Sequence, residues 1–290
     1  VLYTDDTILA GPNKKEIDET IKQIKSAGLQ ITVEGSIEEF LGVRVQRNND
    51  GLFEFTQTHL IDQITQALHI QNARPRPVPA KLETLKRGIN TPPFDNSFNY
   101  RSVLGKIGYL QICTHPDIAY SAHQCARYGT APRKIHGDAL RNIGKYLLGT
   151  RKGGMLYKPD QKRGLEVHVD ADFAGNWDKL DAHNPDTVRS RHGYIISYAG
   201  CPILWKLQLQ SEIALNTTEA EYTGLSYSLR AAIPIMRLLA EMHKNGIKVD
   251  TAPPKITCTV FEDNAGAIEI AKHERLSPRT KHMATKLHHF

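Results

Sequence analysis

The stretch Leu165-Glu-Val-His-Val-Asp170 decides how the second half of the chain is expected to fold. Apolar and polar residues alternate along it, which is the pattern of a strand with one buried face, and the run ends on an acid. Two further strands are predicted after it, over Gly193–Ser197 and Pro202–Trp205. The acid at the end of the first strand is the starting point for predicting a functional site.

A long helix is predicted after these strands, from about Thr217 to Lys244. Asn216 and Glu219 have the spacing of a capping box at its start. Pro234 is expected to kink or split the helix, because proline removes a backbone hydrogen bond from a helix interior. Glu221 lies in the first turn or two of this helix.

A fourth strand, Ile256–Phe261, runs into Asp263 and a short helix over Ala265–Lys272. The order βββαβα predicts an α/β unit over residues 164–290, with a mixed sheet and flanking helices. If the first and fourth strands are neighbours, Asp170 and Asp263 lie at one edge of the sheet. The start of the long helix can then bring Glu221 to the same point.

Three acids at such positions are predicted to bind metal. Clustered carboxylates raise one another's pKa unless a cation neutralises them, and oxygen-only ligands favour Mg²⁺ or Mn²⁺ over zinc. Two such ions, about 3.5–4 Å apart, can activate a water and stabilise the leaving oxygen in phosphodiester hydrolysis. Solvated surface acids are the alternative and describe most single Asp or Glu residues. Three acids at chain reversals favour the metal site.

Positive charge gathers in the middle of the chain. Residues 97–163 contain twelve Lys and Arg against three Asp, a net charge of +9, whereas residues 1–96 carry −2 and residues 164–290 carry −1. Such a local excess is typical of phosphate contact, and a solvated basic surface is the alternative. A helix from Pro132 to Gly149 places Arg141 and Lys145 four residues apart, where their like charges repel. A phosphate backbone bound to this face would explain why both cations are there.

The remaining segments are read from their local patterns. Residues 1–70 are predicted to contain a hairpin around Asp5-Asp6, a helix over Lys14–Ala27, and a second hairpin formed by Phe40–Gln46 and Leu52–Thr56. Residues 71–96 contain five prolines and are predicted to be a linker.

No apolar run approaches the roughly 18 residues of a membrane span. The four cysteines form no CxxC pair and are expected to be reduced, buried thiols, and the two tryptophans are expected in the core.

Nearly end to end, the chain resembles the reverse transcriptase–ribonuclease H part of copia-type LTR retrotransposon polyproteins. The order and spacing of several short motifs carry this resemblance: Leu2-Tyr-Thr-Asp-Asp-Thr-Ile-Leu, Phe40-Leu-Gly-Val, Tyr100-Arg-Ser-Val-Leu-Gly, Pro116-Asp-Ile-Ala, His168-Val-Asp-Ala-Asp-Phe-Ala-Gly, Ser190-Arg-His-Gly-Tyr, Thr217-Thr-Glu-Ala-Glu-Tyr, Asp263-Asn and Arg279-Thr-Lys-His. It implies an α+β palm remnant over 1–70, the Pro-rich linker over 71–96, a basic helical thumb over 97–160 and a ribonuclease H-like domain over 164–290.

The resemblance also implies roles for single residues. The catalytic and metal-binding carboxylates of the ribonuclease H site would be Asp170, Glu221 and Asp263, with two Mg²⁺ or Mn²⁺ ions. Glu219 is the rival for the second role, and Asp172 has at most an indirect one. The paired polymerase aspartates, with their own metal, would be Asp5 and Asp6. Nucleic acid would be bound by the basic helices, with Arg127, Lys134, Arg141 and Lys145 as the candidates.

The implied substrate is the RNA strand of an RNA–DNA hybrid, and the implied partners are this hybrid, other duplex nucleic acid and the rest of the Pol polyprotein. No membrane and no small-molecule cofactor are expected. The implied location is intracellular, in cytoplasmic virus-like particles with a possible nuclear phase. The polymerase needs a further aspartate and fingers before Val1, and the family's fourth ribonuclease H acid is expected after Phe290. We therefore expect a fragment with incomplete polymerase; the alternative is an inactive remnant that only binds nucleic acid.

Overall fold

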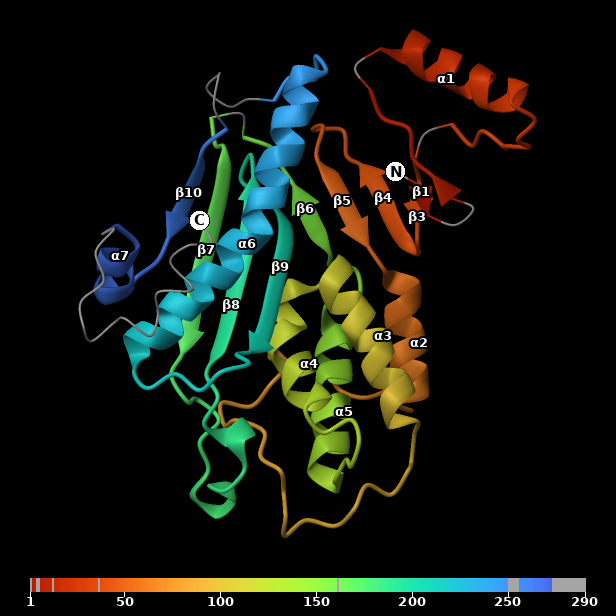
Figure 1. Cartoon of the computed structure of the whole chain (residues 1–290). Helices are drawn as coiled ribbons and strands as arrows, with labels where there is room; N and C mark the ends of the chain where they lie inside the picture. The colour runs from red at the N-terminus through yellow and green to blue at the C-terminus, as the bar shows by residue number, and fades with distance from the viewer. Residues whose placement is uncertain are drawn as a thin grey trace.

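The computed structural model describes residues 2–3, 6–11, 13–35, 37–160, 162–249 and 256–272. Helices and strands are mixed along these residues, in agreement with the α/β prediction. Two four-stranded sheets and one group of helices make up most of the molecule (Figure 1). No helix among these residues is both long enough and apolar enough to cross a membrane.

The second half of the chain forms a sheet with the strand order β10-β7-β8-β9. Its strands are β7 (Leu165–Asp172), β8 (Arg191–Tyr198), β9 (Cys201–Leu209) and β10 (Cys258–Phe261). β10 runs parallel to β7, whereas β8 is antiparallel to both β7 and β9. The expectation that the first and fourth strands are neighbours is confirmed. Two short 3₁₀ helices, η2 (Lys179–Asp181) and η3 (Pro185–Thr187), lie between β7 and β8.

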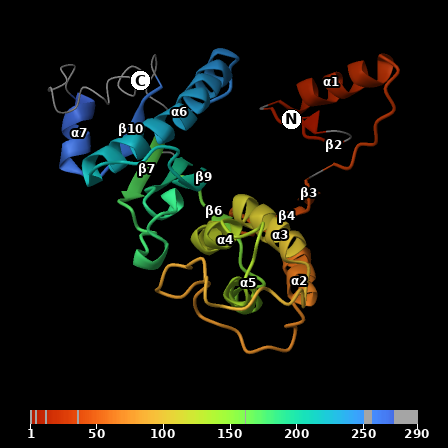
Figure 2. The same cartoon turned by 60° about the horizontal axis from the view of Figure 1, so that its bottom comes forward.

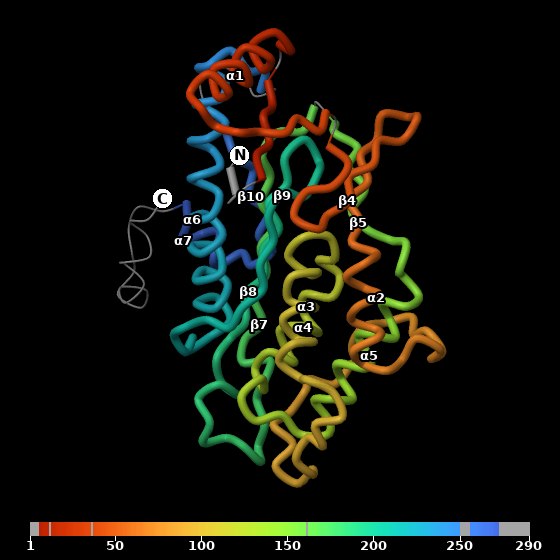
Figure 3. Tube along the Cα trace, turned by 90° about the vertical axis from the view of Figure 1, so that its right-hand side faces the viewer, coloured from red at the N-terminus to blue at the C-terminus, as the bar shows by residue number. Residues whose placement is uncertain are grey.

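Helix α6 (Thr217–Lys244) covers one face of this sheet, and α3 and α4 lie on the other side (Figure 3). Alternate residues of β7, among them Val167 and Val169, are buried against Tyr222 and Leu225 of α6. The prediction for Pro234 was a kink or a split, and α6 is one continuous helix through this residue, so it is not split there. Pro234 is exposed while residues on either side of it, such as Ala232, are buried, and this packing holds the helix together.

Four helices form a second core: α2 (Thr58–Ala67), α3 (Tyr100–Cys113), α4 (Ala119–Ala126) and α5 (Lys134–Gly149), with the 3₁₀ turn η1 (Pro116–Ile118) before α4. Fully buried residues such as Ile64, Ile107 and Leu140 fill it. Helix α2 was missed from sequence, because no element was predicted between Thr56 and the linker. Gly144 allows α5 to approach this core, since a Cβ there would lie 2.6 Å from the Ile70 side chain.

A smaller sheet has the order β3-β4-β5-β6, from β3 (Glu39–Phe40), β4 (Val43–Arg47), β5 (Phe53–Thr56) and β6 (Met155–Tyr157). The predicted second hairpin is β4–β5, which pair antiparallel. β6 follows α5 in the chain and closes the sheet next to β5. The strands β1 (Leu2–Tyr3) and β2 (Asp6–Thr7) pair antiparallel, and they lie with α1 (Lys14–Ser26) apart from the helical group (Figure 2).

Residues 75–93 of the predicted linker pack along the helical group, and we call this segment the strap. Asn142 on α5 donates a hydrogen bond to the Pro79 carbonyl (2.8 Å), and the Tyr128 hydroxyl donates one to the Leu85 carbonyl (2.9 Å). The strap also reaches the second half of the chain, because the Thr84 hydroxyl donates to the Gly175 carbonyl. Its proline-rich composition correctly predicted irregular backbone, but not that this backbone is fixed by both halves of the molecule.

Candidate metal centre

Three acidic side chains converge at one end of the sheet. Asp170 lies on β7, Asp263 follows β10, and Glu221 lies on the first turns of α6. β10 pairs parallel with β7 in a register that sets Phe261 opposite His168, so both strands bring their acids to the same end. One carboxylate oxygen from each acid lies within 4.8 Å of the others. The structure thus brings together the three acids singled out from the sequence.

The start of α6 determines which of its two glutamates joins this cluster. The Asn216 side chain accepts a hydrogen bond from the Glu219 backbone N–H (2.9 Å), and the Glu219 carboxylate accepts one from the Leu215 N–H (2.8 Å). Glu219 therefore satisfies backbone donors at the helix terminus. Glu221 comes two residues later, about 200° further around the helix. It is Glu221, not its rival, whose carboxylate lies beside Asp170 and Asp263.

Glu221 is held in an unfavourable state for a charged side chain. Its residue is only 5% exposed, and its Oε2 atom is buried without a hydrogen-bond partner in the described structure. Burial raises its pKa to about 7, with further increases from the negative charges of Glu262 and Asp170, while a backbone hydrogen bond at Ala171 acts in the opposite direction. A bound cation would offset both the burial of this unpaired oxygen and its repulsion by the neighbouring carboxylates.

Glu262 is a further acid in this environment that was not predicted from the sequence. Its Oε1 accepts a hydrogen bond from the Asn264 N–H (3.0 Å), and its Oε2 is buried without a partner. Burial raises the pKa of this carboxyl too, and the nearby charges of Asp263 and Asp170 add to the shift. Strand alternation could have indicated Glu262. Val260 packs against the core that includes α6 residues, and Glu262, two positions later, is expected on the same face of the strand.

The donor set is suited to a hard divalent cation. All three converging ligands are carboxylates, and oxygen donors are those that Mg²⁺, Mn²⁺ and Ca²⁺ take. The orphaned Oε2 of Glu221 supplies an independent reason, since removing a buried carboxylate from water without a partner is costly. The residues therefore fit a metal centre of this class.

Asp172 is engaged by a neighbouring arginine and lies outside the cluster. Its carboxylate accepts hydrogen bonds from the Arg191 backbone N–H (2.6 Å) and guanidinium (3.2 Å). Arg191 is itself buried, donates to Asn176 and lies over the Tyr120 ring. Asp172 thus fixes the end of β8 against β7, and any influence on a bound metal stays a prediction.

The sheet face that carries Asp170 is hollowed beside the acid cluster. A cavity of about 490 Å³ runs between this face and the start of α4, and Asp170 and Asp172 form part of its wall. Lys206 and Trp205 of β9 line the same cavity. The Trp205 indole N–H donates to the Gln111 carbonyl at 2.7 Å, which joins β9 to α3. Of the three clustered acids, Asp170 is therefore the one open to a ligand approaching along this face.

The predicted nucleic-acid-binding residues differ in how free their charges are. Lys134 is exposed on α5 and Lys145 is half-buried there. Arg141 pairs with Asp138 (3.6 Å), donates to the Ser97 hydroxyl (2.7 Å) and lies over a phenylalanine ring. Asp138 therefore offsets part of the repulsion between Arg141 and Lys145, so this repulsion is a weaker argument for a phosphate partner than expected.

Arg127 has a structural role between the two halves of the chain. Its guanidinium donates to Asn176 in the segment after β7 (3.0 Å) and to Gln124 on its own helix (3.1 Å). Because these bonds occupy the guanidinium, Arg127 is a poorer candidate for phosphate contact than the α5 residues. Its proposed nucleic-acid contact stays a prediction.

Asp6 is the described member of the aspartate pair expected in the polymerase remnant. Asp6 is exposed in β2, opposite Tyr3. Asp5 lies outside the described residues, so a metal site formed by the pair stays a prediction. Two other expectations were partly wrong. Trp177 is 59% exposed rather than in the core, and only Cys125 and Cys201 are buried, although all four cysteines are free thiols.

Comparison with known proteins places the whole chain beside polyproteins of transposable elements. It is 28% identical to the retrovirus-related Pol polyprotein from transposon TNT 1-94 of Nicotiana tabacum, over 99% of the chain. It is likewise 28% identical, over 99% of its length, to the Pol polyproteins from transposons RE2 and RE1 of Arabidopsis thaliana. The chain spans 21%, 18% and 18% of these three relatives, about a fifth of their length. No family model and no solved structure matches.

Proposed function

Because the chain belongs to the copia-type, retrovirus-related Pol polyproteins, we propose that residues 164–290 form its ribonuclease H domain. This domain hydrolyses the RNA strand of an RNA–DNA hybrid. The observation that carries the proposal is the convergence of Asp170, Glu221 and Asp263 to within 4.8 Å from three separate elements. The βββαβα order, with β10 beside β7, supports it, because this arrangement is what brings Asp170 and Asp263 to one end of the sheet.

The three acids would hold the divalent metal, Mg²⁺ or Mn²⁺. When bound, such ions lower the pKa of a water nucleophile and stabilise the leaving oxygen of a phosphodiester. The protein supplies the position of the ligands. Asp170 is fixed by its pairing with Gly193 of β8, just beyond the part of β7 that pairs with β10, and Glu221 is fixed by the capped first turns of α6. Burial keeps water from screening Glu221, which strengthens its attraction to a cation.

Substrate would approach along the hollow face beside Asp170. The hybrid backbone can lie in the cavity lined by Trp205 and Lys206, where the lysine charge attracts phosphate. The basic face of α5 would hold a more distant part of the same duplex through Lys134 and Lys145. In this assignment residues 97–160 are the thumb, and residues 1–70 are the end of the polymerase palm with Asp5 and Asp6 as its paired aspartates.

The direct test is cleavage of a labelled RNA–DNA hybrid by the purified chain with Mg²⁺ or Mn²⁺. We expect Asp170→Asn and Asp263→Asn to abolish cleavage while leaving hybrid binding measurable. Glu241→Gln is the matched control, because Glu241 is an exposed acid near the other end of α6. The parent chain would be only a nucleic-acid-binding remnant if it bound the hybrid but cleaved no faster than Asp170→Asn with either metal.

A further inference from the structure

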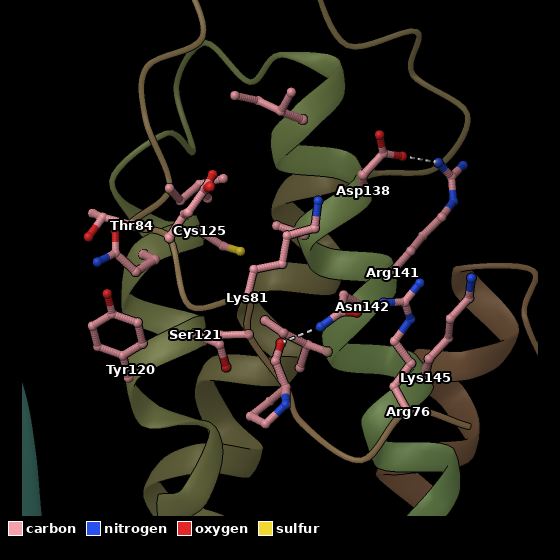
Figure 4. Close-up of a pocket in the computed structure, with 18 of the residues that line it drawn as sticks. Arg76, Lys81, Thr84, Tyr120, Ser121, Cys125, Asp138, Arg141, Asn142 and Lys145 are labelled. Carbon is pink, nitrogen blue, oxygen red and sulfur yellow. Dashed lines mark hydrogen bonds and ion pairs between the residues drawn. The ribbon is translucent and has the colours of Figure 1, made fainter. Parts of the chain in front are cut away.

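A second cavity lies under the strap, away from the acid cluster. It has a volume of about 520 Å³ and is enclosed by the strap on one side and by α4 and α5 on the other (Figure 4). Hydrogen bonds to the carbonyls of Pro79 and Leu85 hold the strap in place over it. A cavity of this volume lies within the range of about 300–1,000 Å³ that small-molecule sites occupy.

Three cations at this cavity have no acidic partner among the described residues: Arg76, Lys81 and Lys145. The Arg76 backbone N–H donates to the Lys145 carbonyl (3.1 Å), which brings the strap and α5 together at this point. In Figure 4 the side chains of Arg76 and Lys145 extend in the same direction beside α5, and Lys81 reaches between α4 and α5. Cations gathered in this way repel one another, and an anion between them would remove that cost.

The other two cations of the cavity, Arg141 and Lys86, do have acidic partners. Arg141 pairs with Asp138 at 3.6 Å, and Lys86 pairs with Asp178 at 3.5 Å. Glu83 is the remaining acid of the cavity wall, against three uncompensated cations. The cavity therefore has a net positive charge that its own side chains do not neutralise.

The deeper wall is apolar and aromatic. Ile135, Ala139 and Ile143 contribute the apolar part from α5, and Tyr120 lines the cavity from α4. A ligand that matched both parts would carry an anionic group at the cations and a flat, weakly polar body against this wall. Inorganic phosphate satisfies only the first requirement. A nucleoside phosphate satisfies both.

We propose that the cavity under the strap binds a nucleoside phosphate, with its phosphate between Arg76, Lys81 and Lys145 and its base against Tyr120 and the α5 wall. The nucleotide is either free or one unit of a nucleic-acid strand, since both present the same group. This site is separate from the acid cluster and does not depend on the ribonuclease activity proposed above. It shares Lys145 with the α5 face assigned to the duplex, so Lys81→Ala, which changes the cavity and not that face, distinguishes the two proposals.

The test measures binding to the full chain in EDTA, which prevents cleavage. The probes are AMP, adenosine, inorganic phosphate and a short fluorescent single-stranded RNA. The double variant Arg76→Ala/Lys145→Ala and the single variant Lys81→Ala should each lower the affinity for the bound probe by about tenfold or more. This is the loss expected when a charge-assisted phosphate contact is removed. Lys15→Ala/Lys22→Ala, which removes two exposed cations from α1, is the matched control.

A charge-neutral variant separates the cavity from general surface charge. Ala139→Leu adds bulk to the apolar wall and should weaken binding without altering any cation. Tight binding of AMP, with adenosine and phosphate both weak, identifies a free nucleotide as the ligand. Binding of the RNA alone identifies a strand. All variants compared must unfold at the same temperature as the parent. The proposal is overturned if the cavity variants lose no more affinity for AMP or for RNA than the α1 control does. It is also overturned if Ala139→Leu binds as the parent does.

Discussion

Glu219 and Glu221 lie two residues apart on α6, yet the Glu219 carboxylate accepts the Leu215 backbone N–H while the Glu221 carboxylate lies with Asp170 and Asp263. The two glutamates are therefore expected to respond differently to mutation. Glu221→Gln should reduce hybrid cleavage by more than about 100-fold, because the lost charge is a metal ligand. Glu219→Ala should leave cleavage within a few fold, but lower the free energy of unfolding by about 0.5–2 kcal/mol through loss of the cap. Equal loss of cleavage in both variants, at equal stability, would contradict this division of roles.

The metal-free protein is expected to lose stability as the pH rises from about 5 to 7. The pKa of Glu221 is about 7 in the folded chain against an ordinary value of 4.5, so the folded state keeps a proton that the unfolded chain releases. The loss should be at most about 3 kcal/mol, since one pKa unit corresponds to about 1.4 kcal/mol. Urea unfolding in EDTA at several pH values measures it.

Two controls test the source of this pH dependence. Glu221→Gln should flatten the profile between pH 5 and 7, because glutamine has no proton to release. Added Mg²⁺ or Mn²⁺ should raise the stability of the parent chain most at pH 7 and above, where the carboxylate is charged. A parent profile that runs parallel to the Glu221→Gln profile would assign the pH dependence to other groups.

Manganese is expected to support faster cleavage than magnesium. Mg²⁺ requires near-ideal octahedral geometry and gives up water reluctantly. In the described part of the chain, three carboxylates converge, and the half-buried Glu262 adds a fourth negative group near them. A site with this donor set should tolerate Mn²⁺ better than Mg²⁺. Initial rates on one hybrid with each metal at saturation decide the point, and a higher rate with Mg²⁺ would refute it.

The salt dependence of hybrid binding should depend on Lys145 more than on Arg141. Each phosphate contact releases condensed counterions, so Lys145→Ala should reduce the slope of log K against log salt by roughly one unit. Arg141→Ala should change the slope less, because Asp138 already offsets part of this charge. Titrations from low to physiological salt test both, with Lys22→Ala as the control. An unchanged slope in Lys145→Ala would exclude this face of α5 from binding.

Arg127→Ala should affect stability rather than nucleic-acid binding. The guanidinium joins α4 to Asn176, and removing it leaves buried polar groups with fewer partners. We expect the free energy of unfolding to fall by about 1–3 kcal/mol and the salt slope to stay that of the parent. Denaturant unfolding and a binding titration on the same variant provide the two readouts. The opposite pattern would restore Arg127 to the binding face.

The sequence by itself determined the local features of the site. Alternation identified the strand that carries Asp170, the capping pair Asn216 and Glu219 located the start of α6, and the strand ending at Phe261 led to Asp263. These signals are readable because they depend on residues within a few positions of one another. The convergence of the three acids could also be expected, since it required only that the first and fourth strands be neighbours.

Only the tertiary structure decided which surroundings these residues have. The buried, unpaired oxygens of Glu221 and Glu262 arise where α6 packs on β7 and α7, contacts between segments far apart in the chain. The packing of the strap, the pairing of β6 with β5 and the engagement of Arg127 by Asn176 have the same origin. Each depends on side chains meeting across long loops. Neither periodicity nor composition records such meetings, because burial and pairing are set by the whole fold and not by neighbouring residues.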